Sequence, residues 1–157
     1  MVLSDVEIAA MLAESKPEVD PRALLQAFVN RTPKFGHRRH AFDVKGASGT
    51  RFQLSLRQSV HDPYDFSVVL SVIRREGTVN LRRHNGSSHA HLNPIEGDRF
   101  RGVFHVHEAT ERYQQRGNDA EHFARETDEF ADLATALTAM LRASSFREPP
   151  QLSLDRT

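Results

Sequence analysis

The sequence predicts a single α+β domain, in which a mostly antiparallel sheet of about six strands is combined with helices at both ends of the chain. Three observations lead to this fold class. Apolar and polar residues alternate through the middle of the 157-residue chain, apolar residues recur at helical spacing near both ends, and short turn sequences separate the segments. Strands joined by short turns pair antiparallel. We expect residues 1–146 to form the domain and residues 147–157 to be a mobile tail.

Two short helices are expected at the amino end. Ser4 and Glu7 have the spacing of a capping box, which marks the start of the first helix. Asp20 and Pro21 are a cap and first-turn pair for a second helix, which should stop by Pro33. The apolar residues that follow each cap lie at the spacing of one helical face.

Six segments in the middle of the chain are expected to be strands, because apolar residues alternate with polar ones in them or fill them. They are residues 40–44, 52–56, 66–73, 78–84, 88–92 and 99–107. Glu76-Gly77 and Asn85-Gly86 are hairpin-type turn sequences between them. We expect the six strands to follow one another in meander order.

Helical spacing returns after Thr110. Glu108–Gln115 should form one or two helical turns, ended by Gly117. A longer helix is expected over Thr127–Ala143, with Thr127 as its cap and an apolar stripe that covers the apolar side of the sheet. The stripe consists of Phe130, Leu133, Ala134, Leu137, Met140 and Leu141.

Composition limits the classes of function. The chain has no cysteine, which excludes disulfides and thiolate metal sites. Its 21 basic and 21 acidic residues cancel, which argues against a protein coated in positive charge for non-specific nucleic-acid binding. Most of the basic residues are arginine, which suits bidentate recognition of phosphate or carboxylate. No apolar run is long enough for a membrane span and no signal peptide is evident, so we expect no membrane association and a cytoplasmic location.

Histidines cluster between positions 84 and 107, where two His-x-His triplets stand in strand-like segments. Residues i and i+2 of a strand point to the same face, so each triplet should present two imidazoles side by side. If the apolar faces of the last three predicted strands share one core, the opposite face collects five histidines and three arginines. They are His84, His89, His91, His105 and His107, with Arg82, Arg99 and Arg101.

This His/Arg face predicts binding of a phosphate-bearing ligand, with RNA as the best match. It also supports the hypothesis of a metal-independent, toxin-type ribonuclease that works by acid–base catalysis. The proton-transfer candidates are His105 and His107, supported by His84 and His89. The candidate phosphate holders are Arg82, Arg99, Arg101 and Arg112, and Tyr113 would position the substrate.

Three alternatives stay open on the sequence. A metal-binding hydrolase would hold zinc or another divalent transition metal with His89, His91, His105 and His107. A non-enzymatic interaction module, such as an antitoxin-like or regulatory protein, would use the same region to bind a protein partner. The face is also compatible with an ordinary solvated sheet surface.

The carboxy-terminal half, roughly His84–Leu141, resembles an uncharacterised prokaryotic domain family. The resemblance rests on three stretches, HNGSSHAHLNPIEGDRF, FHVHEATERYQQRG and ETDEFADLATAL. It implies that the histidine segment and the ATERY segment belong to one unit. It implies no activity, cofactor or catalytic residue.

Overall fold

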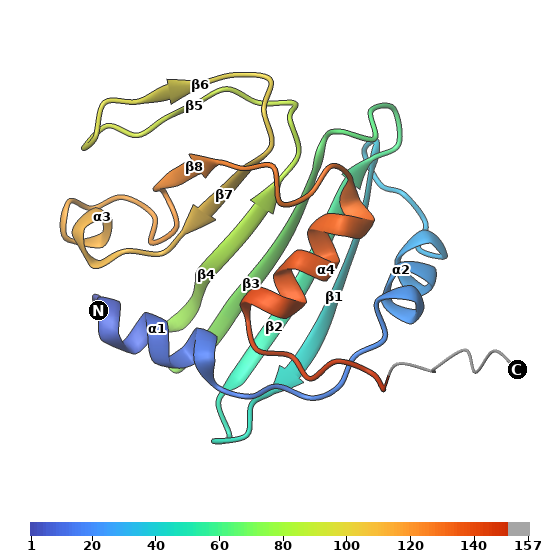
Figure 1. Cartoon of the computed structure of the whole chain (residues 1–157), viewed down its shortest axis with the longest axis horizontal. Coiled ribbons are helices and arrows are strands. Elements are labelled where there is room, and N and C mark those ends of the chain that lie inside the picture. Colours follow the sequence, from blue (N-terminus) through green and yellow to red (C-terminus); the bar gives the residue numbers. More distant parts are fainter. Residues whose placement is uncertain (151–157) are drawn as a thin grey trace, which may run out of the picture.

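Twelve helices and strands build the part of the chain that the computed structural model describes, residues 1–150 (Figure 1). In chain order they are α1 (Asp5–Ala13), α2 (Pro21–Val29), β1 (His37–Lys45), β2 (Arg51–Ser59), β3 (Phe66–Arg74), β4 (Gly77–Asn85), β5 (His91–Leu92), β6 (Arg99–Phe100), β7 (His105–Glu108), α3 (Glu111–Gln115), β8 (Ala124–Glu126) and α4 (Leu133–Ala143). The end of the predicted tail, residues 151–157, lies outside the described residues. Within residues 1–150, no helix combines the length and apolarity that crossing a membrane requires.

Six of the strands form one sheet in the order β1-β2-β3-β4-β7-β8, and every neighbouring pair is antiparallel. The predicted α+β class and the six-stranded antiparallel sheet are therefore confirmed, but the membership of the sheet differs from the prediction. The segments around β5 and β6 leave the main sheet and pair only with each other. The predicted strand 99–107 breaks between β6 and β7, where Gly102 has a φ of 69°. β8, which the sequence did not predict, takes the edge position beside β7.

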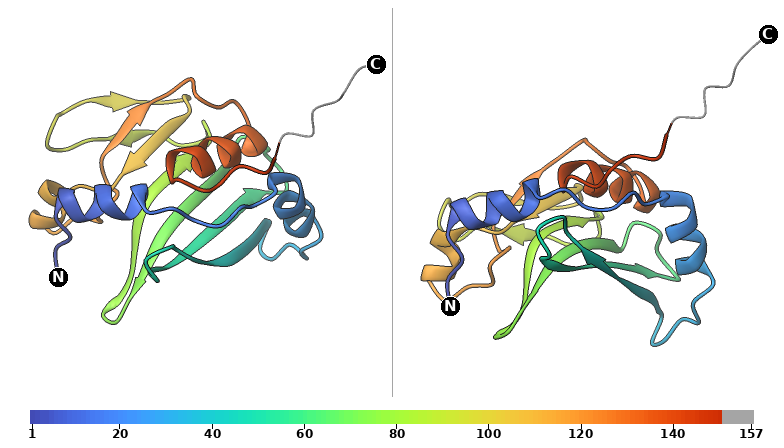
Figure 2. Two further views of the ribbon diagram at one scale, coloured as in Figure 1. Left: turned by 60° about the horizontal axis from the view of Figure 1, so that its bottom comes forward. Right: turned by 90° about the horizontal axis from the view of Figure 1, so that it is seen from below.

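The apolar core lies between the sheet and the helices. Figure 2 shows α1 and α4 on the same side of the sheet, and α4 contacts both β3 and β4. Alternate residues of the central strands face these helices and are almost completely buried. They are Phe52, Leu54 and Leu56 from β2, with Val68, Leu70 and Val72 from β3. The opposite face of β1–β4 carries no helix in the described part of the chain.

The helix starts test the cap predictions directly. The Ser4 hydroxyl accepts the N–H of Glu7, so the predicted capping box of α1 is present, and Asp20 caps α2. The predicted start of the last helix is wrong. Its cap is Asp132 rather than Thr127, because the Asp132 carboxylate accepts the N–H of Thr135 and closes a capping box there.

Lys16 joins the ends of two helices inside the core. Its side chain is 1% exposed, and Nζ lies 2.6 to 3.3 Å from four backbone carbonyl oxygens. Three of these carbonyls belong to the end of α1 and the segment just after it, and the fourth is that of Ser144, the C-cap of α4. Carbonyls at a helix C-terminus lack helical partners and carry partial negative charge, so one ammonium group satisfies both ends. Nearby, Arg147 at the start of the predicted tail donates its N–H to the Lys16 carbonyl at 3.1 Å.

Candidate functional site

The uncovered face of β1–β4 forms a groove of about 940 Å³. The antiparallel register places its side chains in rows across the strands, and one such row runs from Arg39 through Arg57 to Ser67. The lining residues are Arg31, His37, Arg39, His40, Ala41, Gln53, Ser55, Leu56, Arg57, Ser67, Val69, Ser71, Thr78, Asn80 and Arg83. We call this surface the open-face groove.

The open-face groove is basic although the chain as a whole is neutral. Its lining contains four arginines and two histidines, and none of these lining residues, all within residues 1–150, is acidic. Arg57 and Arg83 are each held at about 3 Å by a carboxylate at the border of the groove, Asp65 for the first and Glu121 for the second. Arg39 is exposed, and no ion pair of its guanidinium is found among the described residues. The groove therefore presents oriented cationic donors to a ligand.

A β-bulge in β4 separates the predicted histidine face into two parts. Leu70 pairs with Arg82 and Ser71 pairs with Asn80, so Leu81 is an extra residue between them. The extra residue shifts the alternation by one position, which places Arg82 and His84 on the helix-covered face. The expectation that these two residues share a face with His105 and His107 is therefore wrong.

His84 is a buried structural residue. Its ring is completely buried and stacks on Phe130 with 4.9 Å between ring centroids. Nε2 accepts from Arg82 Nε at 2.9 Å, which leaves Nδ1 to donate to the Ala136 carbonyl of α4 at 3.0 Å. Burial lowers the pKa of His84 to about 3, and the neighbouring Arg82 charge acts in the same direction. The predicted supporting role of His84 in catalysis finds no geometric basis, because the ring faces α4.

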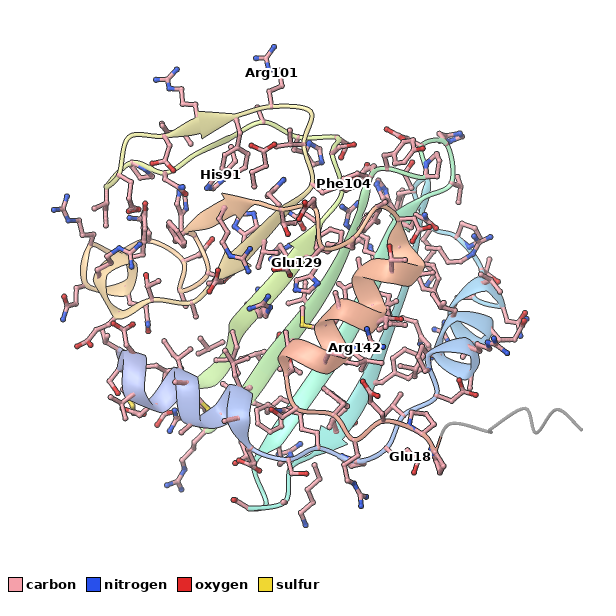
Figure 3. All side chains as sticks on the ribbon, viewed as in Figure 1. Glu18, His91, Arg101, Phe104, Glu129 and Arg142 are labelled. Atoms are coloured by element: carbon pink, nitrogen blue, oxygen red, sulfur yellow. The ribbon has the colours of Figure 1, made fainter. Side chains whose placement is uncertain are left out.

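Four other histidines meet beneath the β5–β6 hairpin. They are His91 of β5, His105 and His107 of β7, and His122, which precedes β8. The His91 ring centroid lies 4.8 Å from that of His107, 6.1 Å from that of His105 and 5.3 Å from that of His122. Figure 3 shows His91 between the hairpin and the main sheet, whereas Arg101 on the same hairpin points away. We call these four residues the histidine cluster.

Hydrogen bonds from backbone and amide groups orient the histidine cluster. Nδ1 of His105 donates to the Val103 carbonyl at 3.1 Å, and Nδ1 of His107 donates to the Glu121 carbonyl at 2.8 Å. The Nε2 atoms of both rings are therefore hydrogen-bond acceptors, and that of His105 lies 3.3 Å from the amide nitrogen of Asn85. His105 is 1% exposed and His107 is 9% exposed, so neither ring is open to a ligand unless the hairpin moves.

Burial also favours the neutral forms of three of these imidazoles, those of His91, His105 and His107. It lowers the pKa of His107 to about 3, and the neighbouring His105 and His91 act in the same direction. The pKa values of His91 and His105 are lowered as well, again mainly by burial. A buried neutral pair suits proton acceptance better than proton donation near neutral pH.

The side chain of Asn93 links the β5–β6 hairpin to the edge of the main sheet by hydrogen bonds. This side chain is fully buried, donates to the Ala124 carbonyl at 2.6 Å and accepts the Ala124 N–H at 2.9 Å. Its Oδ1 also lies 2.9 Å from His91 Nε2, so the same amide orients one ring of the histidine cluster. One side chain thus replaces the missing strand partner on the free edge of β8.

We expect Asn93→Ala to release the hairpin without unfolding the domain. The substitution leaves both backbone groups of Ala124 without their partner, at a cost of about 2 kcal/mol or more. Hydrogen–deuterium exchange should show faster exchange of amides in residues 91–100 and 124–126, with β2 and β3 unchanged. Unchanged exchange in the hairpin would show that Asn93 does not hold it.

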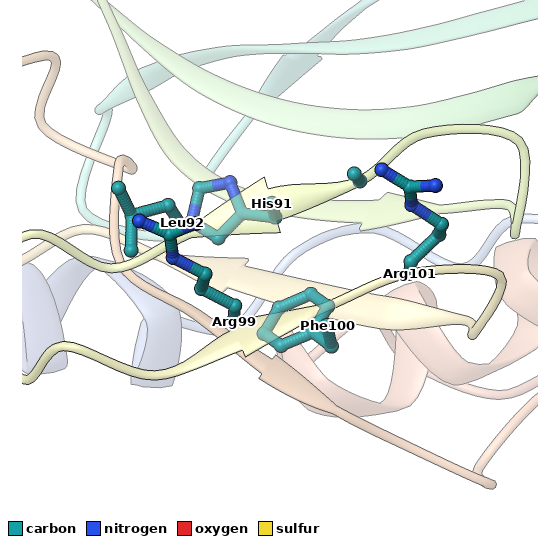
Figure 4. A pocket seen from close by; sticks show the side chains of 6 residues that line it. His91, Leu92, Arg99, Phe100 and Arg101 are labelled. Carbon is teal, nitrogen blue, oxygen red and sulfur yellow. The ribbon is translucent and has the colours of Figure 1, made fainter.

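The other predicted site residues lie apart from the histidine cluster. Arg99 of β6 and Arg101, which directly follows β6, are exposed and line a pocket of about 530 Å³, shown in Figure 4. The side chain of His89 is 66% exposed and lies 3.5 Å from Asp65. Tyr113 is completely buried and donates its hydroxyl proton to Glu96 at 2.8 Å, and Glu96 also pairs with Arg112 at 3.4 Å. The structure therefore does not collect the predicted residues into one pocket.

The alternative metal site is not assembled in this conformation. Among residues 1–150, no three or more histidine, aspartate or glutamate side chains are arranged to hold a metal ion. Nε2 of His89 faces Asp65 at 3.5 Å, and Nε2 of His91 faces Asn93 Oδ1 at 2.9 Å. Of the four proposed ligands, His91, His105 and His107 do come together, but as a packed group of rings.

No protein-family model, curated protein or solved structure matches this chain. The resemblance over roughly His84–Leu141 therefore stays a prediction. The assignment of a function rests on the chemistry of the described residues.

Sequence reasoning missed the arginines of the open-face groove as a group. Arg39 and Arg57 lie just outside the predicted strands 40–44 and 52–56, but β1 and β2 extend over them and pair them directly, so they share a face. His122 and Asn93 were missed for another reason. They reach the histidine cluster through loops and a separate hairpin, for which alternation carries no information.

Proposed function

We propose that this protein binds a phosphate-bearing ligand in the open-face groove, and that single-stranded RNA is the best match. The observation that carries the proposal is the charge of the lining: four arginines and two histidines with no acidic residue among them, in a chain of zero net charge. Arginine forks bind phosphate oxygens in bidentate geometry. A basic groove of this kind draws a polyanion by local charge, which net charge does not reveal.

Two further features favour a single strand of nucleic acid over a small phosphate compound. Between the arginines, the groove carries neutral hydrogen-bonding side chains that suit base edges and ribose hydroxyls, namely Gln53, Ser55, Ser67, Ser71 and Asn80. At its border, Phe35 is fully exposed and has a left-handed backbone with φ of 50°. Left-handed backbone at a residue other than glycine costs free energy, and strain of this kind clusters at ligand sites. An exposed ring beside a basic groove is the arrangement on which unpaired bases stack.

The test is binding of a fluorescently labelled single-stranded RNA, followed by anisotropy at several salt concentrations. We expect Arg39→Glu to weaken binding about tenfold and to reduce the salt dependence, because one phosphate contact is lost and a negative charge is added. The matched control is Arg101→Glu on the outer side of the β5–β6 hairpin, which should bind like the unmodified protein.

The control also distinguishes binding in the open-face groove from binding at Arg101, one of the phosphate holders predicted from the sequence. If Arg101→Glu weakens binding and Arg39→Glu does not, the ligand binds on the hairpin and the open-face groove is the wrong site. If both variants bind RNA as tightly as the unmodified protein, and the affinity does not depend on salt, the protein does not recognise phosphate through these arginines.

A further inference from the structure

Three side chains converge on Asp65 at the end of the open-face groove. Arg57 donates to Oδ1 at 2.9 Å, His89 Nε2 lies 3.5 Å from the same oxygen, and His37 Nε2 lies 3.5 Å from Oδ2. They come from β2, from the loop after β4 and from the start of β1. The carboxylate therefore has one imidazole on each of its two oxygens.

The two imidazoles at Asp65 are more accessible than the buried rings of His105 and His107. The side chain of His89 is 66% exposed and that of His37 is 29% exposed, whereas the Asp65 side chain is 18% exposed. His37 and Arg57 also line the open-face groove. A strand of RNA held in the groove would therefore reach both rings without any movement of the hairpin.

The contacts of the two rings favour different numbers of N–H groups on them. Both nitrogens of His37 face acceptor oxygens, because Nδ1 lies 3.2 Å from the Phe35 carbonyl and Nε2 faces Asp65. An imidazolium, with two N–H groups, satisfies both acceptors. His89 contacts Asp65 through Nε2 alone, so in its neutral form Nε2–H donates to the carboxylate and Nδ1 keeps a lone pair for a substrate.

We infer that Asp65, His37, His89 and Arg57 form an acid–base site that cleaves RNA bound in the open-face groove. This inference rests on the proposed function, and it moves the chemistry away from His105 and His107. His89 acts as the general base, His37 acts as the general acid, and Arg57 neutralises charge on the phosphate. Asp65 is a positioning residue, because it orients both rings and does not touch the substrate.

RNA supplies its own nucleophile, so proton transfers and a cation are sufficient for the reaction. The 2′-oxygen attacks the adjacent phosphorus while His89 Nδ1 takes the 2′-hydroxyl proton. The bond from phosphorus to the 5′-oxygen breaks, and His37 donates the proton of its exposed Nδ1 to that oxygen, while Nε2 stays directed at Asp65. The products are a 2′,3′-cyclic phosphate and a free 5′-hydroxyl. His89 has gained one proton and His37 has lost one, so the number of protons on the two rings together is unchanged. Arg57 holds Asp65 through Nη2 at 2.9 Å, and its other guanidinium N–H groups would stabilise the negative charge that builds up on the phosphate oxygens.

The experiment incubates the full chain with a labelled single-stranded RNA and with DNA of the same sequence, and measures binding and cleavage on the same samples. We expect both strands to bind and only the RNA to be cut, with a 2′,3′-cyclic phosphate identified by mass spectrometry. His37→Ala and His89→Ala should each lower the cleavage rate by a hundredfold or more with binding retained. The matched control is His61→Ala, because His61 is exposed and lies in the loop between β2 and β3 that also carries Asp65. This variant should cleave RNA normally.

Two readouts distinguish chemical roles from structural ones. A substrate with a sulfur in place of the 5′-oxygen has a leaving group that needs no proton, so it should restore cleavage by His37→Ala and not by His89→Ala. Added imidazole should partly restore His89→Ala. Asp65→Asn should lower kcat with KM unchanged, because the rings are mispositioned while the groove still binds.

The outcomes separate this inference from the proposed function. Binding without cleavage by the unmodified protein, or cleavage that both histidine variants retain, overturns the acid–base site and leaves RNA binding standing. Loss of cleavage in His105→Ala with normal cleavage in His37→Ala would return the chemistry to the histidine cluster. Failure to bind either strand overturns both conclusions.

Discussion

Below about pH 6.5 the protein should lose stability steeply and unfold before pH 3. The pKa values of His84 and His107 are both lowered by burial to about 3. In the unfolded chain these groups take up protons near pH 6.5, so between pH 6.5 and 3 the unfolded state binds more protons than the folded one. Stability therefore falls as the pH falls through this window. Each shift corresponds to roughly 4 to 5 kcal/mol, which is comparable with the whole stability of a domain of this size.

Urea unfolding at a series of pH values measures this effect. A matched variant is His84→Gln, whose amide can still donate to the Ala136 carbonyl but does not titrate. It should be less stable than the unmodified protein at pH 7.5 and should show a shallower decline below pH 6.5. A free energy of unfolding that stays flat from pH 7 to pH 4 in the unmodified protein would contradict the buried neutral state of these histidines.

Replacement of Lys16 should produce the second large effect. Lys16→Met keeps most of the side-chain volume and removes the ammonium that four carbonyl oxygens surround. Burial lowers the pKa of Lys16 to about 8 against the opposing attraction of Glu14, so the group is charged at neutral pH. Hydrogen bonds to a charged group are stronger than neutral ones, and their loss here leaves buried carbonyls unpaired. We expect a loss of about 3 kcal/mol or more in the free energy of unfolding.

The control for this substitution is Lys45→Met, because Lys45 is exposed at the end of β1. It should change the free energy of unfolding by less than about 0.5 kcal/mol. The two variants are compared by thermal and urea unfolding at pH 7.5. If Lys16→Met is as stable as the control, the ammonium group does not stabilise the fold by linking the ends of α1 and α4.

The fold class was predictable from the sequence because its signals are local. The Ser4 and Asp20 caps, the alternation in β1 and β2 and the apolar β3 each depend on near neighbours in the chain. The start of α4 was misplaced because two residues with capping side chains, Thr127 and Asp132, precede the same apolar stripe. The choice between them depends on which one closes a capping box, and Asp132 does so with Thr135.

The candidate site was less predictable, because it depends on pairing between distant segments. Alternation correctly placed His105 and His107 opposite the buried Val106. It failed for His84 because the bulge at Leu81 is a property of the β3–β4 pair, which no single strand reveals. It also failed for the segments around β5 and β6, whose partner is each other instead of the main sheet.

The bulge at Leu81 also has a consequence for how this chain could change in evolution. A related chain without that one residue would have a regular pleat from β3 to β4, with Arg82 still opposite Leu70 and His84 still opposite Val68, so the imidazole would stay in the core. In such a chain simple alternation along β4 would give the correct face for the imidazole, whereas in this chain it gives the wrong one. Alignments of such chains must be checked for this offset before any histidine is treated as equivalent.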